Sequence, residues 1–136
     1  MTDELWANQP VVLVVDDDED VRDTTAHLLA MRGFRVLVAS SKQEAMTVVQ
    51  AHPGRVDACV ADLSLPGDTR GDLARSLVEA YPRMRIVYAT GIPRHIALTT
   101  GIVNPDTPYL EKPVDPDVLA SMLRTVLPRP GAASTN

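Results

Sequence analysis

Five side chains that could handle a phosphoryl group stand directly after short apolar runs of this sequence. Asp16 and Asp17 follow VVLVV, and Asp62 follows VDACVA. Thr90 follows MRIVYA, and Lys112 follows TPYLE. In an open parallel α/β sheet the ligand crevice lies outside the carboxyl ends of the strands. If these runs are such strands, two adjacent acids, a third acid, a hydroxyl and an ammonium group meet in one cleft.

Three acids in one cleft need a counter-charge. Two carboxylates about 4 Å apart repel by roughly 4 kcal/mol at an effective dielectric constant of 20. Lys112 supplies one positive charge, and a hard divalent cation would supply the rest. Mg²⁺ prefers oxygen ligands of this kind. A transition metal is disfavoured because no His or Cys accompanies the acids at ligand spacing.

A carboxylate beside Mg²⁺ can attack a phosphoryl group and form an aspartyl phosphate. Such transfer depends on positioning and on neutralising the phosphoryl oxygens, which Mg²⁺, Lys112 and the Thr90 hydroxyl could share. Spacing alone does not say which aspartate is the nucleophile, and Asp18 could replace Asp16 or Asp17 in the pair. Each residue taken singly is as well explained as a helix-start acid, a strand-end hydroxyl or a surface lysine. Their joint placement is what indicates function.

The elements that must position these residues alternate between strand and helix. The capping box from Ser41 to Glu44 opens one helix, and Asp115 with Pro116 opens the last one. We expect Leu73, Leu77, Val78 and Tyr81 on one face of the third helix, and Val118, Leu119, Met122, Leu123 and Val126 on that of the last. Strands are expected at 11–15, 34–39, 56–61, 84–89 and 107–111, and the other helices at about 19–32, from 42 to near 52, and at 94–100.

Alternating strands and helices imply βαβ units with right-handed crossovers. The sequence therefore predicts one three-layer, doubly wound α/β domain with helices on both faces of a parallel sheet. We expect this domain over residues 10–127, with an N-terminal extension over 1–9 and a flexible tail over 128–136.

Composition excludes several classes of function. The 136 residues are 45% hydrophobic and 23% charged, as in an ordinary globular domain. A net charge of −5 without a basic cluster argues against nucleic-acid binding. The apolar runs are far shorter than the roughly 20 residues that cross a bilayer. With no signal peptide and a single cysteine, Cys59, the chain is predicted to be cytoplasmic.

Four segments of the sequence resemble the receiver domain of bacterial response regulators. They are VVLVVDDDEDVR, DACVADLSLPG, IVYATG and YLEKPV, which occur in the family's order and cover residues 11 to about 127. The resemblance implies a CheY-like, flavodoxin-like fold whose five strands lie in the order 2-1-3-4-5.

The resemblance also implies roles for individual residues. Asp62 would be the phosphoacceptor and would share in binding Mg²⁺. Asp17 would bind Mg²⁺ directly and Asp16 largely through water. The main-chain carbonyl of Ser64 would complete the protein's ligands.

The resemblance also implies which residues contact the phosphoryl group and which change conformation on phosphorylation. Thr90 and Lys112 would contact the phosphoryl group, and the Lys112–Pro113 peptide bond would be cis. Tyr109 matches the switch aromatic, which turns inward as Thr90 moves toward the phosphoryl group. Ser64 and Ile92 would flank the path of the attacking water and so tune the lifetime of the phosphorylated state.

The implied partners are proteins. A sensor histidine kinase or a His-phosphotransfer protein would donate the phosphoryl group. A downstream protein would bind the surface formed by the fourth helix, fifth strand and fifth helix, and a phosphorylation-dependent homodimer through that surface is a hypothesis. Self-dephosphorylation would be the only turnover, so we expect a signalling domain and not an enzyme.

Two departures from the family pattern stand out. Gly71 follows Asp62 by nine residues where the family has eight, so the 66–71 loop is expected to be one residue longer. The segment IPRHIALTTGIVNPDTP is more similar to receivers of hybrid histidine kinases than to those joined to DNA-binding domains. Whether the chain is a stand-alone regulator or a receiver from a longer protein stays open.

Two alternatives remain at this point. The first is a haloacid-dehalogenase-like phosphatase, with Asp16 as nucleophile and Asp18 as acid/base. It is opposed by the absence of a strand-end acid pair beyond Lys112 and of a cap domain. The second is a pseudo-receiver, a binding module that keeps the fold without the chemistry, which the altered loop leaves open.

Overall fold

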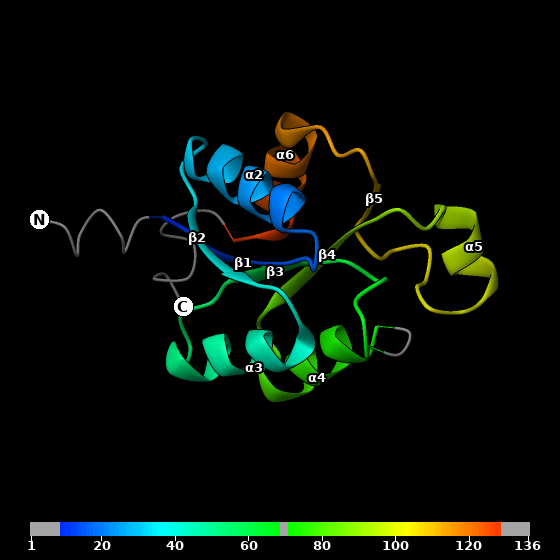
Figure 1. The fold of residues 1–136 in the computed structure, drawn as a ribbon, viewed down its shortest axis with the longest axis horizontal. Helices are drawn as coiled ribbons and strands as arrows, with labels where there is room; N and C mark the ends of the chain where they lie inside the picture. The colour runs from blue at the N-terminus through cyan, green and yellow to red at the C-terminus, as the bar shows by residue number, and fades with distance from the viewer. Residues whose placement is uncertain (1–8, 69–70, 129–136) are drawn as a thin grey trace, which may run out of the picture.

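The computed structural model describes residues 9–68 and 71–128, which form a three-layer α/β fold (Figure 1). The five strands pair in parallel in the order β2-β1-β3-β4-β5, which confirms the predicted fold class. Helices α2 and α6 cover one face of the sheet, and α3 and α4 cover the other. The predicted extension over 1–9 and tail over 128–136 fall almost wholly outside the described residues. The bounds are β1 Val11–Val15, α2 Glu19–Ala30, β2 Arg35–Ala39, α3 Lys42–Ala51, β3 Ala58–Ala61, α4 Asp72–Ala80, β4 Arg85–Thr90, α5 Arg94–Thr99, β5 Tyr109–Glu111 and α6 Pro116–Val126.

Strand β1 is apolar throughout because both of its faces are covered. Val12 and Val14 belong to the core beneath α2 and α6, whereas Leu13 and Val15 belong to the core beneath α3 and α4. Successive strand residues point to opposite faces, so a central strand with two covered faces cannot alternate apolar and polar positions. The carboxyl ends of β1, β3, β4 and β5 line one edge of a sheet whose central strands, β1 and β3, are almost wholly buried.

The predicted helix starts are confirmed by their capping bonds. The Ser41 hydroxyl accepts a hydrogen bond from the Glu44 N–H at 3.1 Å. The Glu44 carboxylate accepts a hydrogen bond from the N–H of Ser40, one residue before the N-cap, at 2.9 Å. Asp115 caps α6 by accepting the Asp117 N–H at 2.8 Å. These bonds satisfy donors that the first turn of a helix leaves unpaired.

The predicted apolar faces of α4 and α6 were wrong in part. Val78 is 42% exposed and Val118 is 48% exposed, while Ala74 and Ala120 are buried in their place. At 3.6 residues per turn, one position turns the side chain by about 100°. In each helix the buried face therefore centres on two leucines four residues apart with an alanine between them, and a valine adjacent to one of the leucines points to solvent. Tyr81, half-buried, is the C-cap of α4 and no part of its helical face.

Several predicted boundaries shift by one or two residues. Helix α2 ends at Ala30 because Gly33, at φ +91°, turns the chain back. The N–H groups of Gly33 and Phe34 then close on the carbonyls of Ala30 and Leu29, both at 3.3 Å. Strands β3 and β5 each begin two residues later than predicted, at Ala58 and Tyr109.

Two glycines of the β3–α4 connection separate the cost of a left-handed backbone conformation from the cost of a steric clash. Gly67 and Gly71 both adopt φ +77°, but a Cβ on Gly67 would meet nothing within 4 Å. A Cβ on Gly71 would lie 3.3 Å from the Tyr88 hydroxyl oxygen. We expect Gly67→Ala to lower the free energy of unfolding by about 1 kcal/mol and Gly71→Ala by about 2 kcal/mol. Urea denaturation of both variants measures the difference, and equal losses would show that Tyr88 exerts no constraint there.

Candidate functional site

The carboxyl edge of the sheet brings together the residues that the sequence singled out. Asp16 and Asp17 follow β1, Asp62 follows β3, Thr90 ends β4 and Lys112 follows β5. One carboxylate oxygen from each of the three aspartates lies within 4.8 Å of the others. Asp16 and Asp62 are only 4% and 6% exposed and Thr90 is fully buried, whereas Asp17 faces solvent. The predicted cleft is therefore confirmed as a cluster of three acids.

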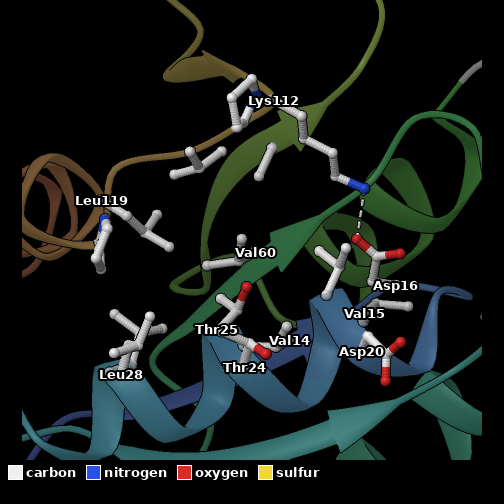
Figure 2. A pocket seen from close by; sticks show the side chains of 16 residues that line it. Val14, Val15, Asp16, Asp20, Thr24, Thr25, Leu28, Val60, Lys112 and Leu119 are labelled. Carbon is white, nitrogen blue, oxygen red and sulfur yellow. Dashed lines mark hydrogen bonds and ion pairs between the residues drawn. The ribbon is translucent and has the colours of Figure 1, made fainter.

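Lys112 is the cation that joins two of the acids. Its Nζ donates to Asp16 Oδ2 at 2.6 Å and to Asp62 Oδ2 at 2.8 Å. Figure 2 shows the first of these bonds, with Lys112 reaching across the sheet edge toward Asp16. The Lys112–Pro113 peptide bond is cis, as the resemblance implied.

The other oxygen of each buried acid accepts a main-chain N–H group. Asp16 Oδ1 accepts from Asp18 and Asp62 Oδ1 accepts from Ser64, both at 2.9 Å. Each carboxylate is thus held between a lysine and a turn of its own loop. This double anchoring fixes the orientation of both side chains before any ligand arrives.

The charges of the site shift the ionisation of its groups. Burial, the largest single effect, raises the pKa of Asp62. Hydrogen bonds from Lys112, Ser64 and Thr90, with the charge of Lys112, outweigh burial and leave the pKa of Asp62 below 3.8. Burial lowers the pKa of Lys112, but its bonds to Asp16 and Asp62 raise that pKa overall. Asp62 is therefore an anion and Lys112 a cation at neutral pH.

The lowered pKa of Asp62 predicts a dependence of stability on pH. Between the folded and unfolded pKa values the unfolded chain binds more protons, so this contribution is present above pH 3.8 and is lost as pH falls through the folded pKa. We compare the unaltered protein with Asp62→Asn by urea denaturation in EDTA. As pH falls below about 4, the free energy of unfolding of the unaltered protein should decrease relative to that of the variant. A difference independent of pH would contradict the lowered pKa.

The carboxylate oxygens of Asp16, Asp17 and Asp62 are close enough together to act as ligands of one divalent cation. Asp17 makes no hydrogen bond or ion pair with any residue of the described ranges 9–68 and 71–128, and its carboxylate is exposed beside Asp16 and Asp62. Lys112 balances only part of the charge of the three acids. Asp18, by contrast, is committed to capping α2, where its Oδ1 accepts the Val21 N–H at 3.1 Å. This capping contact disfavours Asp18 as the acid/base of the phosphatase alternative.

Tyr109 is directed into the protein, beside the loop that follows Thr90. Its ring is 7% exposed, and its hydroxyl donates to the Ile92 carbonyl at 2.6 Å. The Ile92 N–H in turn donates to Thr90 Oγ1 at 3.4 Å. Thr90 and Tyr109 are thus linked through a single residue of the loop, which is the contact that a coupled motion of the two would need.

The sequence reasoning missed Tyr88. Its ring lies 6.3 Å from that of Tyr109 at an interplanar angle of 53°. Its hydroxyl faces Gly71 at the start of α4. Tyr88 stands two residues before Thr90 in β4, so strand alternation puts both on one face of the sheet. That alternation was the available signal that Tyr88 lies on the same face of the sheet as Thr90.

The response regulator receiver domain family matches residues 12–124, and the chain belongs to that family. It is a receiver domain of the two-component signalling type, which confirms the sequence resemblance. Among solved structures, a receiver domain from Clostridium thermocellum has the same fold, with a TM-score of 0.76 at 24% identity over 86% of this chain and 93% of that chain. Chemotaxis protein CheY4 of Vibrio cholerae matches with a TM-score of 0.73 at 26% identity, over 88% of this chain and 99% of that one.

Curated relatives are longer proteins of which this chain matches a part. The photosynthetic apparatus regulatory protein RegA of Rhodovulum sulfidophilum is 32% identical over 84% of this chain and 62% of its own length. A putative NtrX-like response regulator of Rickettsia bellii is 30% identical over 83% of this chain and 24% of its own length. Sensor kinase CckA of Brucella abortus is 27% identical over 85% of this chain and 12% of its own length. The chain thus spans less than two thirds of each.

Among the helices that the structure describes, none has the length and apolar character of a membrane span.

Proposed function

We propose that this receiver domain accepts a phosphoryl group on Asp62 from a sensor histidine kinase or a His-phosphotransfer protein. The observation that carries the proposal is the placement of Asp62. It is a buried, ionised carboxylate with Lys112 Nζ 2.8 Å from one oxygen and the Ser64 N–H 2.9 Å from the other. An Asp62 oxygen forms the new P–O bond while the P–N bond of the donor phosphohistidine breaks and its electron pair returns to the imidazole.

The proposed cation is Mg²⁺, held by Asp16, Asp17, Asp62 and the main-chain carbonyl of Ser64. Supporting it are the three carboxylate oxygens within 4.8 Å of one another and the exposed carboxylate of Asp17, which has no partner among the described residues. Bound Mg²⁺ supplies positive charge to the phosphoryl oxygens. Lys112 would neutralise charge on the remaining phosphoryl oxygens, and the Thr90 hydroxyl would donate a hydrogen bond to one of them.

The proposed response travels from Thr90 through Ile92 to Tyr109, along the contacts already described. The surface that changes in this response is that of α5, β5 and α6, where Ile96 and Val118 expose apolar side chains. We infer that this surface binds a downstream protein, or a second phosphorylated copy of this chain. Relatives that include a sensor kinase and several regulators support a place in a phosphorelay.

The test is uptake of a phosphoryl group from acetyl phosphate, followed by intact mass. We expect one added phosphoryl group in the presence of Mg²⁺ and none in EDTA. Hydroxylamine should remove it, because an acyl phosphate is cleaved by that nucleophile and a phosphoserine or phosphothreonine is not. A protein that never gains mass from acetyl phosphate or from a histidine kinase would be a pseudo-receiver, and the proposal would fail.

A further inference from the structure

A cavity of about 580 Å³ lies beside the acidic cluster, between α2, the sheet and the start of α6 (Figure 2). Small-molecule sites typically measure about 300–1,000 Å³ and are mostly apolar with a few polar groups. Val14, Val60, Leu28 and Leu119 line this cavity. Asp16 and Lys112 also line the cavity, but Asp17, Asp62 and Thr90 do not. The cavity therefore adjoins the phosphoacceptor site and shares Asp16 and Lys112 with it, but it does not include Asp62.

Two threonines of α2, Thr24 and Thr25, bring hydroxyl groups to the cavity. In the other described helices, Thr47, Thr99 and Thr125, with Thr100 at the C-cap of α5, donate to the carbonyl four residues earlier, at 2.7 to 3.1 Å. Thr24 and Thr25 make no hydrogen bond with any described residue, and both line the cavity. Figure 2 shows the Thr25 side chain rising from α2 toward Val60. Hydroxyl groups that forgo the helix backbone are available to a ligand, as donor or acceptor.

The uncompensated charge at the cavity mouth is negative. Asp20, in the first turn of α2, lines the cavity and forms no ion pair or hydrogen bond within the part of the chain that the structure describes. Lys112 is already bonded to Asp16 and Asp62. The three acids of the neighbouring cluster add to the negative field. An anionic ligand would be repelled here, and a cationic head group would be attracted.

We propose that this cavity binds a small amphipathic amine, with its ammonium group at Asp20 and its apolar body between α2 and Leu119. The ammonium group donates to the Asp20 carboxylate and to the Thr24 and Thr25 hydroxyls. An aromatic or branched aliphatic body occupies the wall formed by Val14, Leu28, Val60 and Leu119. The ligand class follows from charge complementarity at the mouth and apolar lining in the interior. This site is additional to phosphoryl transfer and does not depend on it.

The probe that tests the proposal is phenethylamine, titrated into ¹⁵N-labelled protein in an amine-free buffer with EDTA. Two ligands of similar body serve as comparators: 2-phenylethanol with a neutral head and 3-phenylpropionate with an anionic one. We expect saturable shifts in the amide signals of the cavity residues, with affinity falling from amine to alcohol to acid. Asp20→Asn should weaken amine binding by about threefold, as expected for an exposed charge pair, and should leave alcohol binding unchanged.

The second part of the test fills the cavity with a larger side chain. Thr25→Leu should weaken phenethylamine binding by tenfold or more, which corresponds to about 1.4 kcal/mol. Thr47→Leu, a helical threonine on α3 outside the cavity, should bind as the unaltered protein does. If Thr25→Leu does not give a folded spectrum, Thr25→Val removes the hydroxyl at nearly the same shape and should still weaken binding.

Three outcomes would overturn the proposal. They are no saturable shifts with phenethylamine, equal affinity for the three head groups, and unchanged affinity in both Thr25 variants. The readout requires neither Mg²⁺ nor a phosphoryl donor. A failed titration would therefore leave the role of Asp62 untouched, and a failed phosphorylation would leave this site untouched.

Discussion

Asp62→Asn is expected to gain no phosphoryl group from acetyl phosphate under conditions in which the unaltered protein gains one. The amide of asparagine has the size of the carboxylate and can still accept the Ser64 N–H bond. It lacks the negative charge and the nucleophilic oxygen that form the new P–O bond. Because Asp62 is nearly buried and anchored at both oxygens, no neighbouring group can move into its place without rebuilding the loop. Intact mass in Mg²⁺ measures the effect directly.

Two further variants make that result specific. Asp23→Asn removes an exposed acid of α2 whose ion-pair partner among the described residues is Arg22, and it should be phosphorylated normally. Asp16→Asn should be phosphorylated more slowly, because it removes a proposed cation ligand but keeps the nucleophile. A mass gain that survives in Asp62→Asn and disappears in Asp16→Asn would make Asp16 the nucleophile. That outcome would reverse the assignment and favour the haloacid-dehalogenase type of chemistry.

Lys112→Met is expected to slow phosphoryl uptake by about 100-fold, the usual cost of removing one preorganised donor from a developing charge. Methionine keeps much of the length and apolar surface of lysine but has no charge to place on a phosphoryl oxygen. The time course of mass gain at fixed acetyl phosphate measures the rate. A variant that is phosphorylated as fast as the unaltered protein would show that Lys112 has only a structural role.

The same substitution should also weaken the fold. Lys112 compensates two buried carboxylates, and removing one partner of a buried ion pair leaves the others unpaired. The lysine side chain is partly exposed, so water screens some of this loss. We expect Lys112→Met to lower the free energy of unfolding in EDTA by about 1–3 kcal/mol.

Lys42→Met is the matched control for the stability effect. Lys42 forms an ion pair with Asp72, and both side chains are substantially exposed. Surface pairs of this kind contribute about 0–1 kcal/mol. Urea denaturation of both variants separates the two cases, and similar losses would mean that the buried acids do not depend on Lys112.

Much of the fold could be predicted from local patterns. The apolar β1 run, the capping box at Ser41 and the Asp115-Pro116 start of α6 each act over a few residues, so the sequence displays them directly. The meeting of Asp16, Asp62, Thr90 and Lys112 also followed, because parallel strands place their carboxyl ends at one edge. Exposure of Val78 did not follow, since periodicity gives a helix face but not the angle at which the sheet meets it.

By itself the sequence determined which chemical groups reach the carboxyl edge of the sheet, because short-range patterns show where each strand ends and that strands alternate with helices. Only the tertiary structure decided how those groups are paired. Lys112 bonds to Asp16 and Asp62 and leaves Asp17 free, although the three aspartates are alike in sequence. The Tyr88–Tyr109 contact and the cavity beside Thr25 arise in the same way. Distances between side chains on different elements depend on how the helices sit against the sheet, and no local pattern carries that geometry.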